Sequence, residues 1–229
     1  MQVPDAVKRL LSAPDVPQRT PAWYAARLEV LTASDVAAAP GIKPFKGYKG
    51  DPREDALLKK LNNHPFGNVY CAHGQKWEDH ARDLAMRALG ETAVDFGLLV
   101  HPREPWLAAS PDGVTLTGRC IEIKCPLSRD IVPGHVPAHY VPQIQVQMEV
   151  CDLDATYFIQ YKPAEVSKKH HEELDIVVVE RDRRWFAENR DAMHAFWAEY
   201  MARRRTHVPE PPPPPPRCLV ADDLYDVIA

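Results

Sequence analysis

The sequence has 229 residues, of which 45% are hydrophobic and 26% charged, with a formal net charge of −4 at pH 7. These values predict a globular protein that can bury a sizeable core. No segment has the pattern of a signal peptide and no apolar run is long enough to cross a bilayer, which argues against a secreted or membrane-spanning chain. The acidic balance does not indicate nucleic-acid binding, so such a role would depend on local clusters of Lys and Arg.

Five cysteines are scattered along the chain, at positions 71, 120, 125, 151 and 218. No Cys-x-x-Cys pair occurs, which argues against a structural zinc site or an iron–sulfur cluster. An odd number of cysteines without a disulfide framework is typical of reduced thiols in a cytoplasm, and we expect the protein to be cytoplasmic.

The predicted elements begin with helices. Helical patterns cover residues 5–11, 23–28, 52–61 and 77–89, and Gly90 ends the last of these. The segment Thr32-Ala33-Ser34-Asp35 precedes an Ala-rich run and predicts a further helix start with a hydroxyl cap. Residues 41–50 form a loop rich in Lys, Gly and aromatic residues.

The second half of the chain alternates strands with helices. Strands are predicted at 92–101, 106–109 and 119–124 as a three-strand meander, and at 155–161 and 174–179. Helices are predicted at 141–150 and 183–205. This order predicts an α/β fold in a single domain, with a mixed β-sheet flanked by helices. We expect the domain to cover residues 1–208.

Residues 209–229 have a different composition. Six consecutive prolines, Pro211 to Pro216, favour an extended polyproline II spacer. Residues 217–229 follow and are acidic and apolar together. This end of the chain is either disordered or a short linear motif that is held away from the body to reach a partner.

The chemically informative residues are Asp112, Glu122 and Lys124. Asp112 lies in a Ser-Pro-Asp-Gly turn, and a predicted strand about ten residues later carries Glu122 and Lys124 two positions apart. Side chains alternate across a strand, so Glu122 and Lys124 face one side while Ile121, Ile123 and Cys125 face the other. A Glu-x-Lys pair alone would be an ordinary surface ion pair. The turn Asp beside it favours a nuclease site that binds a divalent metal and phosphate.

The residue types fit this chemistry. Mg²⁺ prefers oxygen ligands and binds through one or two carboxylates together with substrate phosphate. Two such ions can activate a water and stabilise the leaving oxygen of a phosphodiester. Asp112 would bridge them, and Glu122 with the backbone carbonyl of Ile123 would complete one site. Lys124 would orient the attacking water or neutralise charge on the scissile phosphate. Mn²⁺ is a possible substitute.

Several motifs together resemble a known family. The segments are Ser-Pro-Asp-Gly at 110–113, Glu-Ile-Lys-Cys-Pro at 122–126 and Ser-Arg-Asp at 128–130. They resemble the bacteriophage lambda exonuclease family, also called YqaJ-like viral recombinases, in the PD-(D/E)xK nuclease superfamily. Supporting blocks follow in the family's order between residues 23 and 200: Trp23, Arg27-Leu28, Thr32-Ala33-Ser34, Gly74-Gln75-Lys76-Trp77-Glu78, Tyr140, Gln143-Ile144-Gln145, and the strands near 157–161 and 178–182.

The resemblance implies a restriction-endonuclease-like fold and a Mg²⁺-dependent exonuclease that digests one strand of duplex DNA from a 5′-phosphate end. It also implies a ring-shaped homotrimer that works in the cytoplasm of a bacterial host cell. A single-strand annealing protein is the implied partner, and residues 217–229 are a candidate contact for it.

The resemblance also assigns further site residues. Glu78 matches an extra carboxylate near the metals, which it would bind directly or through water; otherwise it is a solvated helix charge. Four residues match the group that holds the terminal 5′-phosphate: Arg27, Ser34, Ser110 and Gln145. A guanidinium, hydroxyl donors and a helix start suit a phosphate. Arg27 in a surface ion pair and Ser34 as a plain helix cap are the alternatives. On a helix, Gln143 and Gln147 share a face that Gln145 does not.

Two segments depart from the family or remain open. The family has a Leu that separates the strands before its Gly-x-x-aromatic-Glu helix, whereas this chain has Cys71-Ala72-His73, so Tyr70 or His73 is the candidate. The basic loop 43–49 either grips DNA by charge and stacking or is simply solvated.

Three other functions compete with an exonuclease. A structure-specific or restriction-like endonuclease would use the same metal site but would need no anchor for a terminal phosphate. An inactive DNA-binding recombination scaffold would not require Asp112, Glu122 and Lys124 together. A metal hydrolase built on His135 and His139 is disfavoured, because Pro137 between them opposes the helix that this spacing needs.

Overall fold

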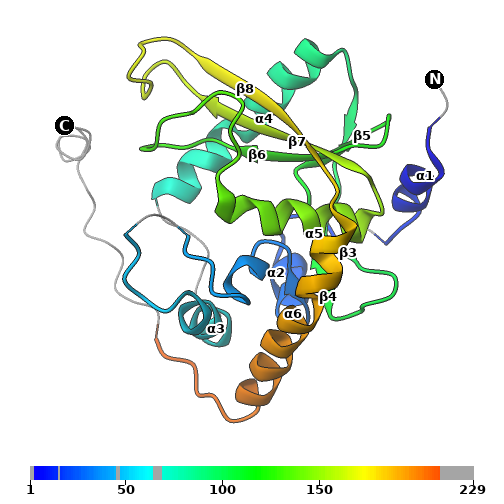
Figure 1. Cartoon of the computed structure of the whole chain (residues 1–229), viewed down its shortest axis with the longest axis vertical. Coiled ribbons are helices and arrows are strands. Elements are labelled where there is room, and N and C mark those ends of the chain that lie inside the picture. Colours follow the sequence, from blue (N-terminus) through cyan, green and yellow to red (C-terminus); the bar gives the residue numbers. More distant parts are fainter. Residues whose placement is uncertain (1–2, 15, 45–46, 64–68, 212–229) are drawn as a thin grey trace.

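A five-stranded mixed sheet organises the protein (Figure 1). The computed structural model describes residues 3–14, 16–44, 47–63 and 69–211. The strand order is β2 (Ala93–Val94), β5 (Gly113–Thr115), β6 (Cys120–Lys124), β7 (Ala155–Lys162) and β8 (Glu173–Glu180). The central strands β6 and β7 are parallel, with Glu122 opposite Phe158, and the other neighbours are antiparallel.

A helix covers each face of this sheet. Helix α4 (Val69–Leu89) packs Ala81 and Ala85 against Ile121 and Ile123 in one apolar cluster. Helix α5 (Val141–Cys151) runs along the opposite face, below the sheet in Figure 1. Glu122 is turned toward α5, where it meets the glutamines of that helix. The predicted alternation of side chains on this strand is therefore confirmed.

A second, smaller sheet positions the N-terminal part of the chain. Its order is β1 (Leu31–Thr32), β4 (Leu107–Ala109) and β3 (Leu99–Val100), with β1 parallel to β4. The backbone N–H of Ala33 extends this pairing by donating to the carbonyl of Ala108 at 2.8 Å. Because β4 leads directly into Ser110, the small sheet brings residues 32–34 beside the motif turn.

The remaining helices surround these two sheets. They are α1 (Asp5–Leu11), α2 (Pro21–Arg27), α3 (Pro52–Asn62) and α6 (Arg183–Arg204), with the short 3-10 helices η1 (Val36–Ala38) and η2 (Ala138–Tyr140). Local sequence explains the starts of three of them. The side chains of Thr20, Asp51 and Asp182 accept hydrogen bonds from the first free N–H groups of α2, α3 and α6. Pro52 at the start of α3 costs no hydrogen bond.

The predicted fold class is confirmed, since the chain is a single domain with mixed sheets flanked by helices. Two local predictions are wrong. The segment 92–101 forms two short strands, β2 and β3, in different sheets. The predicted hydroxyl-capped helix start at 32–35 is instead strand β1 followed by η1, and no side chain caps η1. Helix α4 begins at Val69, earlier than expected, and β1 and β5 were not predicted.

Three further sequence predictions concern the cysteines, membrane-spanning helices and the C-terminal tail. Among the described residues, Cys71, Cys120, Cys125 and Cys151 carry free thiols. No helix in the described part of the chain is both long and apolar enough to span a membrane. The tail beyond Pro211 lies outside the described residues, so its predicted spacer and partner motif stay predictions.

Candidate active site

Asp112, at the start of β5, lies beside the residues Glu122 and Lys124 of the neighbouring strand β6. The carboxylate of Asp112 accepts a hydrogen bond from the backbone N–H of Ile123 at 2.7 Å, which ties the turn to β6. Lys124 forms an ion pair with Glu122 two residues before it. Glu122 is 1% exposed and Lys124 is largely buried. The turn Asp and the Glu-x-Lys strand therefore form one group, as the sequence predicts.

Burial and neighbouring charges both shift the pKa values of this group. Burial raises the pKa of Asp112 well above its ordinary value, and the neighbouring carboxylates of Glu122 and Glu78 raise it further. Burial alone would lower the pKa of Lys124, but the two carboxylates Glu122 and Asp112 outweigh it and hold that pKa above its ordinary value. The two carboxylates therefore favour the protonated ammonium of Lys124.

Two glutamines of α5 hold the buried Glu122. The side-chain amide of Gln143 donates to one carboxylate oxygen at 2.7 Å, and that of Gln147 donates to the other at 2.5 Å. They are four residues apart and so share one helix face. Both side chains belong to the site, although the sequence assignment did not include them. Their four-residue spacing on one helix was the sequence signal that could have identified them.

Glu78 borders the same cleft as Asp112. The cleft has a volume of about 250 Å³, and its lining includes Arg19, Glu78, Arg82 and Asp112. Glu78 on α4 is half-buried and accepts a hydrogen bond from Arg19 at 2.5 Å. Arg82, one turn further along α4, donates to the backbone carbonyl of Asp112 at 3.1 Å. The structure thus places Glu78 and Asp112 in the same cleft.

The donor set of this cleft fits a hard divalent cation. Its lining carboxylates are Glu78, Asp79, Asp95 and Asp112, and a cation would favour the charged form of Asp112, whose pKa is raised by burial and then by Glu122 and Glu78. As the side chains stand, no three His, Cys, Asp or Glu residues in the described part of the chain are grouped to hold a metal. The oxygens of Glu122 are occupied by Lys124 and the two glutamines, and Glu78 is paired with Arg19. Metal binding would therefore rearrange these contacts.

Arg27, Ser34 and Ser110 form a second group. Arg27 is 8% exposed, and its guanidinium donates to the Ser34 hydroxyl at 3.0 Å and stacks on the Trp23 ring at 4.3 Å. The indole N–H of Trp23 donates to the Ser110 hydroxyl at 2.9 Å. Ser110 is two residues before Asp112, so this group adjoins the carboxylate site. A guanidinium beside two hydroxyl groups can bind a phosphate.

Gln145 does not join this group. Its side-chain amide donates to the carbonyl of Glu180 at 2.9 Å, and its carbonyl accepts from the N–H of Asp182 at 2.7 Å. Both ends of the amide thus hold the turn that leads into α6. Its predicted contact with a terminal phosphate would require these hydrogen bonds to break, and the contact stays a prediction.

An aromatic ring borders the group formed by Asp112, Glu122 and Lys124. The ammonium of Lys124 lies 5.0 Å from the centroid of the Tyr140 ring, and the guanidinium of Arg129 lies 5.8 Å from the same ring. Such contacts stabilise a cation without neutralising it.

His139, next to Tyr140, lies in η2, whereas His135 is in a turn before that helix. The two histidines therefore do not share a helix.

The candidate DNA-contact segments are only partly described. Tyr70 is 50% exposed on the first turn of α4, and His73 is half-buried one turn later. Either position stays a prediction for strand separation. Within the basic loop 43–49, the hydroxyl of Tyr48 donates to Asp55 of α3. Phe45 and Lys46 lie outside the described residues.

Solved structures with this fold include an alkaline exonuclease. LHK-Exo from Laribacter hongkongensis is 28% identical, and the match covers 81% of this chain and 95% of that one with a TM-score of 0.66. A second structure of LHK-Exo, in complex with dAMP, matches equally well at 27% identity and a TM-score of 0.66.

Two curated viral proteins are similar in sequence. An uncharacterised protein, R354 of Acanthamoeba polyphaga mimivirus, is 30% identical over 176 residues, which are 69% of this chain and 31% of that protein. Protein D345L of African swine fever virus is 30% identical over 157 residues, which are 56% of this chain and 44% of that protein. The chain therefore spans less than half the length of these relatives.

The family assignment rests on more than half of the chain. The model of the YqaJ-like viral recombinase domain matches residues 22–154, which contain Arg27, Glu78, Asp112, Glu122 and Lys124. The same residues build the two side-chain groups described above. The resemblance stated from the sequence motifs is confirmed, and the chain belongs to the YqaJ-like viral recombinase family.

Proposed function

We propose that this protein is a Mg²⁺-dependent deoxyribonuclease that digests one strand of duplex DNA from its 5′ end. The observation that carries the proposal is that Asp112, which is bonded to β6 beside the Glu122–Lys124 ion pair, also lines a cleft together with Glu78. Two carboxylates that can bind a divalent metal and an ammonium that can balance phosphate charge are suited to the hydrolysis of a phosphodiester. The similarity to an alkaline exonuclease supports the same activity.

The proposed metal site uses the carboxylates of the two motif residues together with Glu78. Asp112, Glu122 and the carbonyl of Ile123 would hold one ion, with Asp112 shared and Glu78 reached directly or through water. A bound divalent ion would lower the pKa of water and stabilise charge on the phosphate oxygens. Two ions, or Mn²⁺ in place of Mg²⁺, are compatible with the same oxygen donors.

The protein's own groups have separate roles in this proposal. Lys124 is a protonated ammonium beside Glu122, placed to orient water or to balance negative charge on the scissile phosphate. Gln143 and Gln147 fix the orientation of Glu122. Arg82 holds the backbone of Asp112. Orienting groups of this kind keep the reacting atoms within the narrow geometry that catalysis needs.

A terminal phosphate anchor favours an exonuclease over an endonuclease. Arg27 and Ser34 are hydrogen-bonded to each other, and Ser110 is joined to them through Trp23. An endonuclease that cuts internal bonds has no terminal 5′-phosphate to bind. A nucleoside 5′-monophosphate, which is the product of such digestion, is the ligand in one LHK-Exo structure.

The proposed biological role is the preparation of 3′ single strands for annealing-type recombination. The family resemblance supports a homotrimer that encloses DNA, a single-strand annealing protein as partner, and action in the cytoplasm of a bacterial host cell. Removal of residues 217–229 tests the partner contact, since we expect it to weaken that contact and to leave digestion unchanged. Failure of the shortened chain to digest DNA would show that the tail serves the enzyme itself.

Linear and covalently closed circular plasmid DNA distinguish the two kinds of nuclease. With Mg²⁺, the protein should release mononucleotides from linear duplex, leave single-stranded DNA behind, and leave the closed circle intact. EDTA, or Asp112→Asn with Mg²⁺, should abolish degradation. Nicking or linearisation of the closed circle would favour an endonuclease, and binding without cleavage would favour an inactive scaffold.

A further inference from the structure

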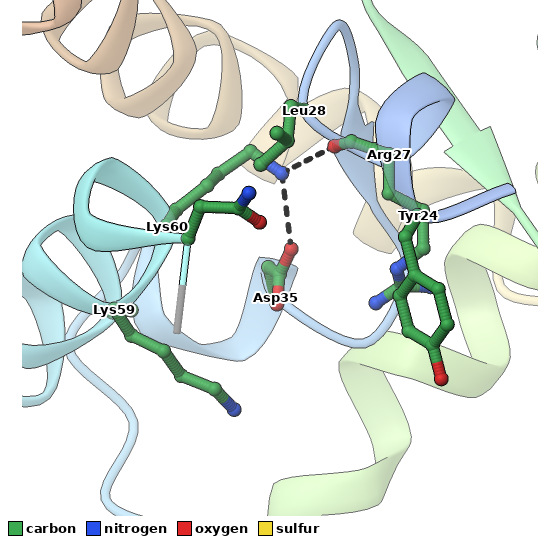
Figure 2. A pocket seen from close by; sticks show the side chains of 8 residues that line it. Tyr24, Arg27, Leu28, Asp35, Lys59 and Lys60 are labelled. Atoms are coloured by element: carbon green, nitrogen blue, oxygen red, sulfur yellow. Dashed lines mark hydrogen bonds and ion pairs between the residues drawn. The ribbon is translucent and has the colours of Figure 1, made fainter. Parts of the chain in front are cut away.

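A buried ion pair lies behind the proposed phosphate anchor. Lys60 reaches from α3 to the backbone carbonyl of Arg27, to which it donates at 2.6 Å, and to the carboxylate of Asp35 at 3.5 Å (Figure 2). The Lys60 side chain is 7% exposed and that of Asp35 is 20% exposed. Lys60 therefore links α3 to both segments that carry the anchor.

A chain of hydrogen bonds connects this pair to Ser34. The hydroxyl of Thr32 donates to the carboxylate of Asp35 at 2.7 Å and lies 3.1 Å from the hydroxyl of Ser34. Ser34 in turn accepts from the guanidinium of Arg27 at 3.0 Å. Lys60 thus acts on the anchor by two routes, through the backbone of Arg27 and through Asp35 and Thr32 to Ser34.

The charges in this region favour a bound anion. Burial lowers the pKa of Arg27 and of Lys60, and Asp35 opposes both shifts. Asp35 is the single carboxylate among the described residues that line the pocket, against the cations Arg27, Lys59 and Lys60. Buried charges are costly unless they are paired. A phosphate at Arg27 would add a second negative charge to this region, beside Asp35.

We propose that Lys60, paired with Asp35, is a positioning residue. It holds the side chains of Arg27 and Ser34 where they can bind a terminal 5′-phosphate together. This inference rests on the proposed function. Lys60 itself does not reach the phosphate, because its ammonium is turned to the Arg27 carbonyl and the Asp35 carboxylate. Its effect is on end discrimination, whereas a purely structural role would affect stability alone.

Binding of short duplexes measures this discrimination independently of cleavage. Fluorescence anisotropy with Ca²⁺ in place of Mg²⁺ gives dissociation constants for duplexes that end in a 5′-phosphate or a 5′-hydroxyl. Wild type should prefer the phosphate, and Lys60→Met should reduce that preference roughly tenfold, the weight of one hydrogen bond to a charged group. Lys8→Met is the matched control, because Lys8 of α1 is also a lysine in an ion pair, with Asp5, but does not line this pocket, and the preference should persist.

Asp35→Asn provides a second variant in case Lys60→Met does not fold, and it should reduce the preference as well. The double variant should cost less than the sum of the two single changes, because the residues act together. A folded Lys60→Met or Asp35→Asn protein with wild-type preference would overturn the inference and leave the proposed function intact. A wild-type protein with no preference between the ends would overturn both the inference and the 5′-phosphate anchor.

Discussion

Gln147 of α5 donates its side-chain amide to the carboxylate of Glu122 on β6 at 2.5 Å, across the interior between helix and sheet. Gln147 is fully buried and Glu122 is 1% exposed. A carboxylate this deeply buried needs hydrogen-bond donors from the protein to stabilise its negative charge and to fix its orientation. Helix α5 is therefore part of the candidate active site as well as part of the core.

Gln147→Leu should impair cleavage, because one oxygen of Glu122 would lose its donor. Groups that orient a metal-binding residue typically contribute about 10–100-fold to activity, and we expect a loss of this size in kcat with Mg²⁺. Steady-state rates on linear duplex measure it. Activity near wild type in a correctly folded Gln147→Leu protein would show that Glu122 needs no support from α5.

Gln145 lies between the two glutamines that hold Glu122, and the variant Gln145→Leu tests whether its role is structural or phosphate-binding. It removes two hydrogen bonds to the turn at Glu180 and Asp182, so we expect stability to fall by roughly 1–3 kcal/mol. Preference for 5′-phosphorylated ends should remain. Thermal melts and initial rates on both kinds of end test this. Loss of the preference with no change in stability would favour the phosphate contact that the family resemblance implies.

The buried His101 should make the fold less stable in mild acid. Its Nδ1 accepts from the N–H groups of Arg103 and Glu104, both at 3.0 Å, and burial lowers its pKa although Glu149 opposes the shift. A His with a lowered pKa in the folded state binds fewer protons than in the unfolded state. Its contribution is complete above the unfolded pKa of about 6.5 and is lost as pH falls below it.

Melting temperatures at pH 7.5 and pH 5.5 measure this contribution. His101→Asn keeps an acceptor for the turn and cannot titrate, so its melting temperature should fall less between the two conditions than that of wild type. His73 and His139 have pKa values shifted in the same direction, so part of the slope should remain. Equal slopes for wild type and His101→Asn would contradict the prediction.

Arg27 should govern the choice of DNA end. Arg27→Ala removes the guanidinium beside Ser34, and digestion of 5′-phosphorylated duplex should fall toward the rate on 5′-hydroxyl duplex. Arg27→Lys keeps the positive charge but cannot donate the bidentate hydrogen bonds of a guanidinium. It should therefore recover only part of the preference for 5′-phosphorylated ends. Initial rates on the two substrates give the ratio. An equal loss on both ends would mean that Arg27 does not read the phosphate.

The sequence predicted the features that depend on local pattern. Alternation along a strand placed Glu122 and Lys124 together, and the turn residues placed Asp112 beside them. Helical spacing also indicated that Gln143 and Gln147 share a face without showing what that face meets. Their partner became evident only when α5 was seen against β6.

Features that depend on distant contacts could not be predicted in this way. The segment 32–35, which includes Thr32, was expected to begin a helix with a hydroxyl cap, because hydroxyl residues favour that position. In the fold Thr32 pairs with Ala108, more than seventy residues away, and that pairing makes it part of β1. The contact of Lys60 with Arg27 and Asp35 has the same origin, because no local pattern relates residues of α3 to the end of α2.

The central claim is tested most directly by following which strand end is released from a linear duplex in Mg²⁺. Duplexes with a 5′-phosphate and a label at either the 5′ or the 3′ terminal nucleotide are digested in parallel by wild type and by Asp112→Asn. The account predicts immediate release of the 5′-labelled mononucleotide by wild type, late release of the 3′ label, and no release by Asp112→Asn. Early release of the 3′ label, labelled oligonucleotide fragments, or unchanged rates in Asp112→Asn would contradict it.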